Sequence, residues 1–115
     1  MSTGSDKRRE TRVPLDLWVE AQREGETYYQ RALNLSVGGF YFAQTVPMPL
    51  GTRVTLTFTL PGESAELSCQ GEVVAAKEMG MGVHFVDLPS KERKRIEAAI
   101  EGIETKLELR KPKQA

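Results

Sequence analysis

Residues 54–60 read Val-Thr-Leu-Thr-Phe-Thr-Leu, with an apolar side chain at every second position. Successive side chains of a β-strand point to opposite faces, so this pattern predicts a strand with one buried face and one exposed face. The turn residues Pro61-Gly62-Glu63-Ser64 follow directly. Because a second alternating run occupies residues 67–75, the sequence predicts a hairpin at this point.

The same two-residue period extends over most of the chain. It occurs at residues 15–21 and 79–85. Residues 27–33 form an extended, aromatic-rich run, Phe40-Tyr41-Phe42 forms a further short run, and most of the connecting segments contain Gly or Pro. About six strands with short connections are typical of a small antiparallel barrel or sandwich. In the runs at residues 67–75 and 79–85, the residues expected to face the core are Leu67, Cys69, Gly71, Val73, Ala75, Met79, Met81, Val83 and Phe85.

After the last strand the period changes to about three and a half residues, which indicates a helix. We expect this helix over residues 89–107 and the barrel over residues 15–88. The apolar stripe that would lie on the barrel consists of Ile96, Ala99, Ile100, Ile103 and Leu107.

Length and composition are those of one globular domain, with 115 residues, 39% hydrophobic and 28% charged. No apolar run approaches the roughly 18 residues that cross a membrane, so membrane insertion is not expected. Residues 1–6 are small and polar, without the basic and apolar regions of a secretory signal, which predicts a disordered start and a cytoplasmic location. Residues 108–115 form a basic tail.

Metal and disulfide chemistry are not expected. The chain has one cysteine, Cys69, and one histidine, His84, so neither an intrachain disulfide nor a His/Cys zinc site can form. Cys69 lies on the apolar side of its strand, which predicts a buried, inert thiol. His84 lies on the polar side of its strand, which predicts a position at the surface or at the rim of a ligand site.

The charge is balanced overall, with 16 basic and 16 acidic residues, but it is unevenly distributed. Residues 1–12 carry a net charge of +2 and residues 106–115 a net charge of +3, so the body between them carries −5. Long nucleic acids usually require a broad basic face, so we do not expect them as partners. Two basic ends can still hold a small anionic ligand or contact an acidic protein.

The first candidate motif is Arg8-x-x-x-Arg12. A guanidinium carries a permanent charge, matches phosphate oxygens or the O6/N7 edge of guanine, and stacks on planar bases. In an extended segment Arg8 and Arg12 point to the same side, whereas Arg9 points away. An arginine-rich run near a terminus is also compatible with a simple solvated segment.

The second candidate motif is Asn34-x-Ser36-x-x-Gly39. Asn and Ser stabilise turns through side-chain hydrogen bonds to the backbone, and Gly permits a close backbone approach. Asn34 and Ser36 share a side in an extended segment, where an amide and a hydroxyl can contact a base edge or a ribose. The same residues are also compatible with an ordinary loop.

Taken together, the two motifs resemble those of the PilZ domain family, which pairs RxxxR with (D/N)xSxxG. The segment Gly82-Val83-His84-Phe85 resembles the closing strand of that family, and residues 11–18 and 58–62 resemble small stand-alone PilZ proteins of the Myxococcus type. This resemblance implies a six-stranded antiparallel barrel with a C-terminal helix over residues 7–107, in which residues 7–14 form a ligand-binding arm. It also implies cyclic di-GMP as the ligand. The residues that it assigns to the ligand are Arg8, Arg12, Asn34, Ser36 and Gly39, with Lys7, Arg9, Gly38 and Gly82 as further candidates.

The resemblance implies a receptor rather than an enzyme, and no acid/base, metal or Walker-type phosphate motif points to catalysis. The expected output is a change of the arm on ligand binding that signals to an unidentified downstream protein in the control of motility, polysaccharide or adhesion. The alternative is a PilZ-fold adaptor that binds no nucleotide. Many relatives that bind a stacked ligand dimer have Arg where this chain has Lys7. The stoichiometry of binding, one or two ligands per chain, therefore remains open. We expect a monomer or a weak dimer without a cofactor.

Overall fold

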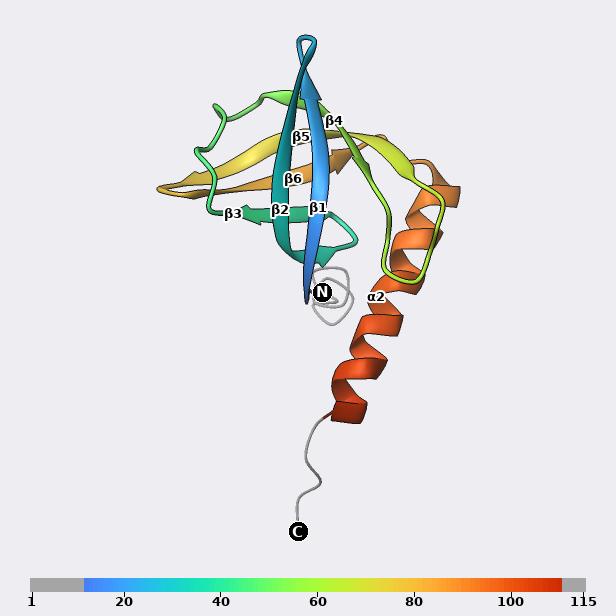
Figure 1. Ribbon diagram of the computed structural model, residues 1–115. Coiled ribbons are helices and arrows are strands. Elements are labelled where there is room, and N and C mark those ends of the chain that lie inside the picture. The colour runs from blue at the N-terminus through green and yellow to red at the C-terminus, as the bar shows by residue number, and fades with distance from the viewer. Residues whose placement is uncertain (1–11, 111–115) are drawn as a thin grey trace, which may run out of the picture.

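A computed structural model describes residues 12–110 of the chain. Six antiparallel strands close into a barrel in the order β1-β2-β3-β6-β5-β4, followed by one helix (Figure 1). This confirms the fold predicted from the sequence. The elements are β1 (Val13–Arg23), β2 (Glu26–Ser36), β3 (Gly39–Ala43), β4 (Arg53–Phe58), β5 (Leu67–Lys77), β6 (Gly80–Val86) and α2 (Ser90–Arg110).

The barrel interior is built from the alternating apolar positions of the strands. Val54, Leu56 and Phe58 of β4 are all buried, as the alternation predicts. The ring of Phe40 meets that of Phe58 edge to face, with 4.8 Å between the ring centroids. This is a favourable geometry for aromatic pairs, so the aromatic contact adds to the apolar burial that stabilises the fold.

The first strand begins earlier than expected. Val13 is buried and lies opposite Leu35, and Pro14 lies opposite Asn34. The last two residues of the predicted arm, 13 and 14, therefore belong to the barrel, because the β1–β2 ladder continues to them. Residues 1–11 and 111–115, which include the predicted disordered start, most of the arm and most of the basic tail, lie outside the described part of the chain.

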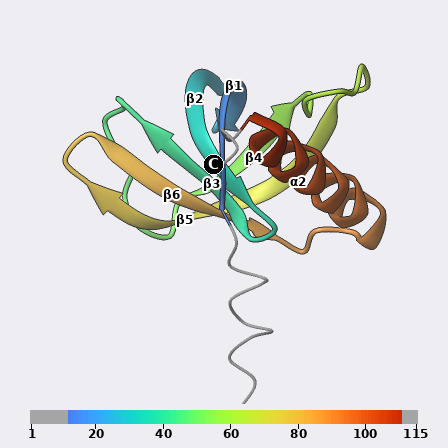
Figure 2. The ribbon, with the colours of Figure 1, turned by 90° about the horizontal axis from the view of Figure 1, so that it is seen from below.

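Helix α2 lies beside the barrel (Figures 1 and 2), and in Figure 1 its C-terminal end extends below the strands. Ile96 and Ile100 are buried against the core, and Ile103 is half-buried. The helix extends beyond its predicted end at residue 107, so residues 108–110 are helical rather than part of a tail. Leu, Glu and Arg favour helix, and the chain reaches a helix-breaking proline only at residue 112.

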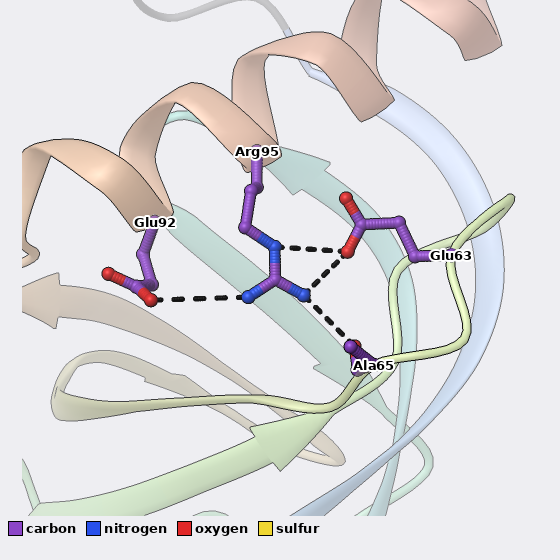
Figure 3. Close-up of polar contacts among 4 residues, drawn as sticks. All are labelled: Glu63, Ala65, Glu92 and Arg95. Carbon is purple, nitrogen blue, oxygen red and sulfur yellow. Dashed lines mark hydrogen bonds and ion pairs between the residues drawn. The ribbon is translucent and has the colours of Figure 1, made fainter.

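Arg95 connects the helix to the loop between β4 and β5 (Figure 3). Its Nε donates to Oε1 of Glu63 at 3.0 Å, and its Nη2 donates to the carbonyl oxygen of Ala65 at 2.9 Å. Glu92, one helical turn earlier, lies 3.9 Å from Nη1. The guanidinium fork thus holds α2 against one defined loop, so Arg95 is a structural residue rather than part of a solvent-exposed helix face.

Two strand residues predicted to face the core are exposed, and so is Leu107 at the end of the predicted helical stripe. The β5–β6 register shifts between Val73 and Ala75, which is a β-bulge, and beyond it Ala75 faces outward. Met79 is 57% exposed because it lies in the turn that precedes β6, whereas Met81 within the strand is buried. A bulge adds one residue to one strand, and this reverses the side on which all later residues lie.

Within residues 12–110, no helix is both long enough and apolar enough to cross a bilayer.

The thiol of Cys69 should be inert in the folded protein. It is buried, and loss of solvation, with a smaller contribution from the charge of Glu92, raises its pKa to about 11. Only the thiolate reacts, so we expect alkylation by iodoacetamide at pH 8 on the order of 100-fold slower than in the urea-unfolded chain. Equal rates in the two states would show that the thiol is accessible in the native protein.

Candidate functional site

A concave pocket of about 230 Å³ lies on the outer face of the barrel, across β2, β3, β6 and β5. The residue that precedes β1, Arg12, closes one side of the pocket, and the end of β5 closes another. The lining residues are Arg12, Ser36, Gly39, Phe40, Tyr41, Val74, Ala75, Lys77, Gly82 and His84.

Strand register explains why these residues lie together. One row across the sheet joins Ser36, Gly39 and His84, because each is the direct partner of the next. A second row joins Asn34, Tyr41, Gly82 and Ala75. Residues that are partners across a sheet share a face, so four strands contribute to a single surface.

Gly39 allows β3 to approach β6 closely. A Cβ at this position would lie far inside van der Waals contact of the Val83 carbonyl oxygen, and 2.9 Å from the Val83 carbonyl carbon. The neighbouring backbone is equally close, since the amide of Phe85 donates to the carbonyl oxygen of Gly38 at 2.8 Å. The glycine of the second motif therefore has a structural role, which is to place the β2–β3 turn directly on β6.

Gly82 keeps the pocket open. A Cβ at Gly82 would meet only the Cβ of Ala75, at the ordinary contact distance of 3.4 Å. Two residues earlier on β6 the space is filled, because a Cβ at Gly80 would lie 2.7 Å from Cζ of Tyr41. Tyr41 thus extends over Gly80 and forms a wall, while the missing side chain of Gly82 leaves a floor on which a ligand can lie.

Ser36 shapes the turn above this floor. Its Oγ accepts a hydrogen bond from the amide of Gly38 at 3.2 Å, which is the local bond expected for a serine in a turn. The hydroxyl hydrogen is not used in this bond and can be donated to a ligand. Ser36 can therefore stabilise the turn and contact a ligand at the same time.

The charge of the pocket is opposite to that of the body. Among its described lining residues, Arg12 and Lys77 are cationic and none is acidic, although residues 13–105 carry a net charge of −5. Beside Lys77, Val74 and Ala75 offer an apolar surface. Cations beside apolar side chains suit a ligand that combines phosphate with a planar base.

Within residues 12–110, no group of three or more His, Cys, Asp or Glu side chains is arranged to hold a metal ion.

The structure brings four of the predicted site residues together. Arg12, Ser36, Gly39 and Gly82 line the pocket. Asn34 is half-buried in the row of Tyr41 and Gly82 and adjoins the pocket without lining it, and Gly38 lies in the turn above. The remaining predicted contacts, Lys7, Arg8 and Arg9, lie outside the described residues.

Sequence reasoning missed several of the lining residues. His84 was expected at a surface or rim position, and its outward parity agrees with its place in the pocket. Tyr41 also lies on the outward side of its strand, so parity could have indicated it. Val74 lies at a bulge on the outward side of β5, so parity could have indicated it as well. Ala75 and Lys77 follow the bulge, and no feature of the sequence marks that bulge.

The family model for the PilZ domain matches residues 6–102 of the chain. The chain therefore belongs to the PilZ family, as its two motifs indicated. A search of curated protein sequences found no significant match.

Solved structures of PilZ domains share the fold. The PilZ domain of CeSA from a cellulose-synthesizing bacterium has a TM-score of 0.65 and 21% identity, and the match covers 82% of this chain and 98% of that one. The PilZ domain of YcgR from Escherichia coli, solved with c-di-GMP, has a TM-score of 0.71 and 12% identity over 84% of this chain and 91% of that one. PlzA from Borreliella burgdorferi, in complex with c-di-GMP, has a TM-score of 0.56 and 17% identity over 84% of this chain and 42% of that one.

Proposed function

We propose that this protein is a cyclic di-GMP receptor. The observation that supports this most directly is the pocket in which Arg12 of the first motif meets Ser36 and Gly39 of the second. Two segments more than twenty residues apart in the sequence contribute to one cationic concavity. Two PilZ structures with the same fold were solved with c-di-GMP.

The chemistry of the pocket matches this ligand. Cyclic di-GMP has two phosphates and two guanines, and the guanidinium of Arg12 can bind a phosphate or the O6/N7 edge of guanine, or stack on a base. The missing side chain at Gly82 supports the placement of a planar ring there, since a Cβ would meet only Ala75. Asn34 and Ser36 supply an amide and a hydroxyl for a base edge or a ribose.

The proposed output is a change of the arm that precedes the barrel. Arg12 lies directly before Val13, the first residue of β1, which pairs with Leu35. Ligand contacts to Arg8 and Arg12 would close the segment over the nucleotide and alter the surface that a downstream protein meets. A cytoplasmic location, the lack of enzymatic activity and a monomeric or weakly dimeric state remain predictions from the sequence.

Calorimetric titration of the full chain with cyclic di-GMP tests the proposal, with GTP and cyclic AMP as controls. We expect saturable binding of cyclic di-GMP alone, and the stoichiometry will distinguish one ligand from two. A folded protein that does not bind cyclic di-GMP would contradict the receptor function and favour the adaptor alternative.

An Arg12→Ala variant should bind cyclic di-GMP about 10- to 150-fold more weakly, since losing charge-assisted hydrogen bonds costs about 1.5–3 kcal/mol. Arg8→Ala should have an effect of the same order, and Arg9→Ala a smaller one. Arg93→Ala, on the exposed face of α2, is the matched control. Undiminished binding by both Arg8→Ala and Arg12→Ala would refute the assigned role of the motif, and a dominant effect of Arg9→Ala would refute the parity argument.

A further inference from the structure

The β5 side of the pocket contains a cation that neither motif includes. Lys77 is the last residue of β5, lies opposite Gly80 of β6, and lines the pocket together with Val74 and Ala75. Across the strands that form the pocket, β2, β3 and β6 lie between β1 and β5, while β4 pairs with both on the other side of the closed barrel. The two cations of the pocket, Arg12 and Lys77, therefore approach it from opposite sides.

The β-bulge explains why Lys77 reaches this surface. Leu67, Cys69 and Val73 point into the barrel, so regular alternation would direct residues 75 and 77 inward as well. The register shift between Val73 and Ala75 reverses this parity, and both Ala75 and Lys77 are exposed. Bulges are frequent beside binding sites, where they redirect side chains. Here the bulge directs an ammonium toward the pocket instead of the core.

The adjacent glycines of β6 leave room for a ligand beside Lys77. Ala75 lies opposite Gly82, whose missing side chain forms the open floor. Lys77 lies opposite Gly80, over which Tyr41 extends. Lys77 thus lines the pocket at the edge of the floor, together with the aliphatic side chains of Val74 and Ala75.

The geometry points to Lys77 as a second anion-binding residue of the site, which contacts a phosphate of the nucleotide from the side opposite Arg12. This inference rests on the proposed binding of cyclic di-GMP. A ligand with two phosphates has an anionic group for each side of the pocket. An ammonium binds phosphate as a point charge, so Lys77 contributes mainly through its charge.

A charge-specific set of variants tests this inference. Lys77→Met removes the charge and retains an unbranched apolar side chain, Lys77→Arg retains the charge, and Lys91→Met on the exposed start of α2 is the matched control. By calorimetry with cyclic di-GMP, we expect Lys77→Met to bind about 5- to 20-fold more weakly at low ionic strength. The loss should decrease in 0.5 M salt, since salt screens exposed charges. Lys77→Arg should bind within about threefold of the wild type, and Lys91→Met should match it.

A second pair of variants tests the same side of the pocket without altering Lys77. Val74→Glu places a carboxylate on the exposed bulge, and Val74→Gln has nearly the same size without the charge. We expect Val74→Glu to bind more weakly than Val74→Gln, because the carboxylate repels the ligand phosphates. Thermal unfolding of each variant checks that the barrel is intact.

The outcomes separate this inference from the proposed function. If the wild type binds cyclic di-GMP but Lys77→Met binds equally well, or Val74→Glu and Val74→Gln bind alike, then the β5 side does not contact a phosphate and the inference is wrong. If the wild type does not bind, both the receptor function and the role of Lys77 are refuted.

Discussion

A Gly39→Ala variant should lose about 2–4 kcal/mol of folding free energy, a large part of the stability of a small domain. The added methyl group would overlap the Val83 carbonyl oxygen, and backbone cannot move aside as a flexible side chain can. To relieve the overlap, β3 would have to separate from β6 at the pair formed by Gly39 and His84. Urea unfolding monitored by circular dichroism measures the loss.

Gly38→Ala is the matched control for this variant. Gly38 is the preceding residue in the same turn, but a Cβ there would meet only Oγ of Ser36, at 3.7 Å. We expect its stability to stay within about 1 kcal/mol of the wild type. Equal stability of Gly39→Ala and Gly38→Ala would contradict the close approach of β3 to β6.

The second motif combines two structural roles, one of Gly39 and one of Ser36. Gly39 fixes the position of the β2–β3 turn through backbone contact with β6, and Ser36 then shapes the turn through its bond to Gly38. Both contacts are made by the protein's own backbone and side chains. The second motif thus preorganises the pocket, which reduces the ordering cost of binding.

Much of the fold could be predicted from the sequence because it depends on periodicity. The alternation in residues 54–60 appears as buried Val54, Leu56 and Phe58, and the stripe containing Ile96 and Ile100 appears as the buried side of α2. These patterns are repeated over many residues. Each arises from the burial of apolar side chains, so one irregular residue does not hide it.

The parts of the site that could not be predicted depend on single backbone irregularities. The bulge after Val73 reverses the direction of Ala75 and Lys77, and nothing in the local composition marks it. The position of Tyr41 over Gly80 depends on the register of β3 against β6, which is a long-range property. Motif spacing indicated Arg12, Ser36 and Gly39, but strand pairing decides which other side chains complete the pocket.

A Gly82→Leu variant should bind cyclic di-GMP on the order of 10- to 100-fold more weakly, although its barrel remains folded. A Cβ at Gly82 meets only Ala75, and the rest of a leucine side chain would extend into the pocket and overlap the ligand, at a cost of about 1–3 kcal/mol. Gly82→Ala should have a smaller effect, since a single methyl group fits at ordinary contact distance. Calorimetry gives the affinities, and thermal unfolding reports on the fold.

Gln70→Leu is the matched control, since it adds a leucine at an exposed position of β5 that does not line the pocket. We expect Gln70→Leu to bind as tightly as the wild type, with Gly82→Ala between wild type and Gly82→Leu. This graded order depends on side-chain volume over the floor and not on charge, so it tests the location of the ligand independently of Arg12. If Gly82→Leu is folded and binds with wild-type affinity, the nucleotide does not lie over Gly82, and the ligand site must be sought elsewhere on the barrel.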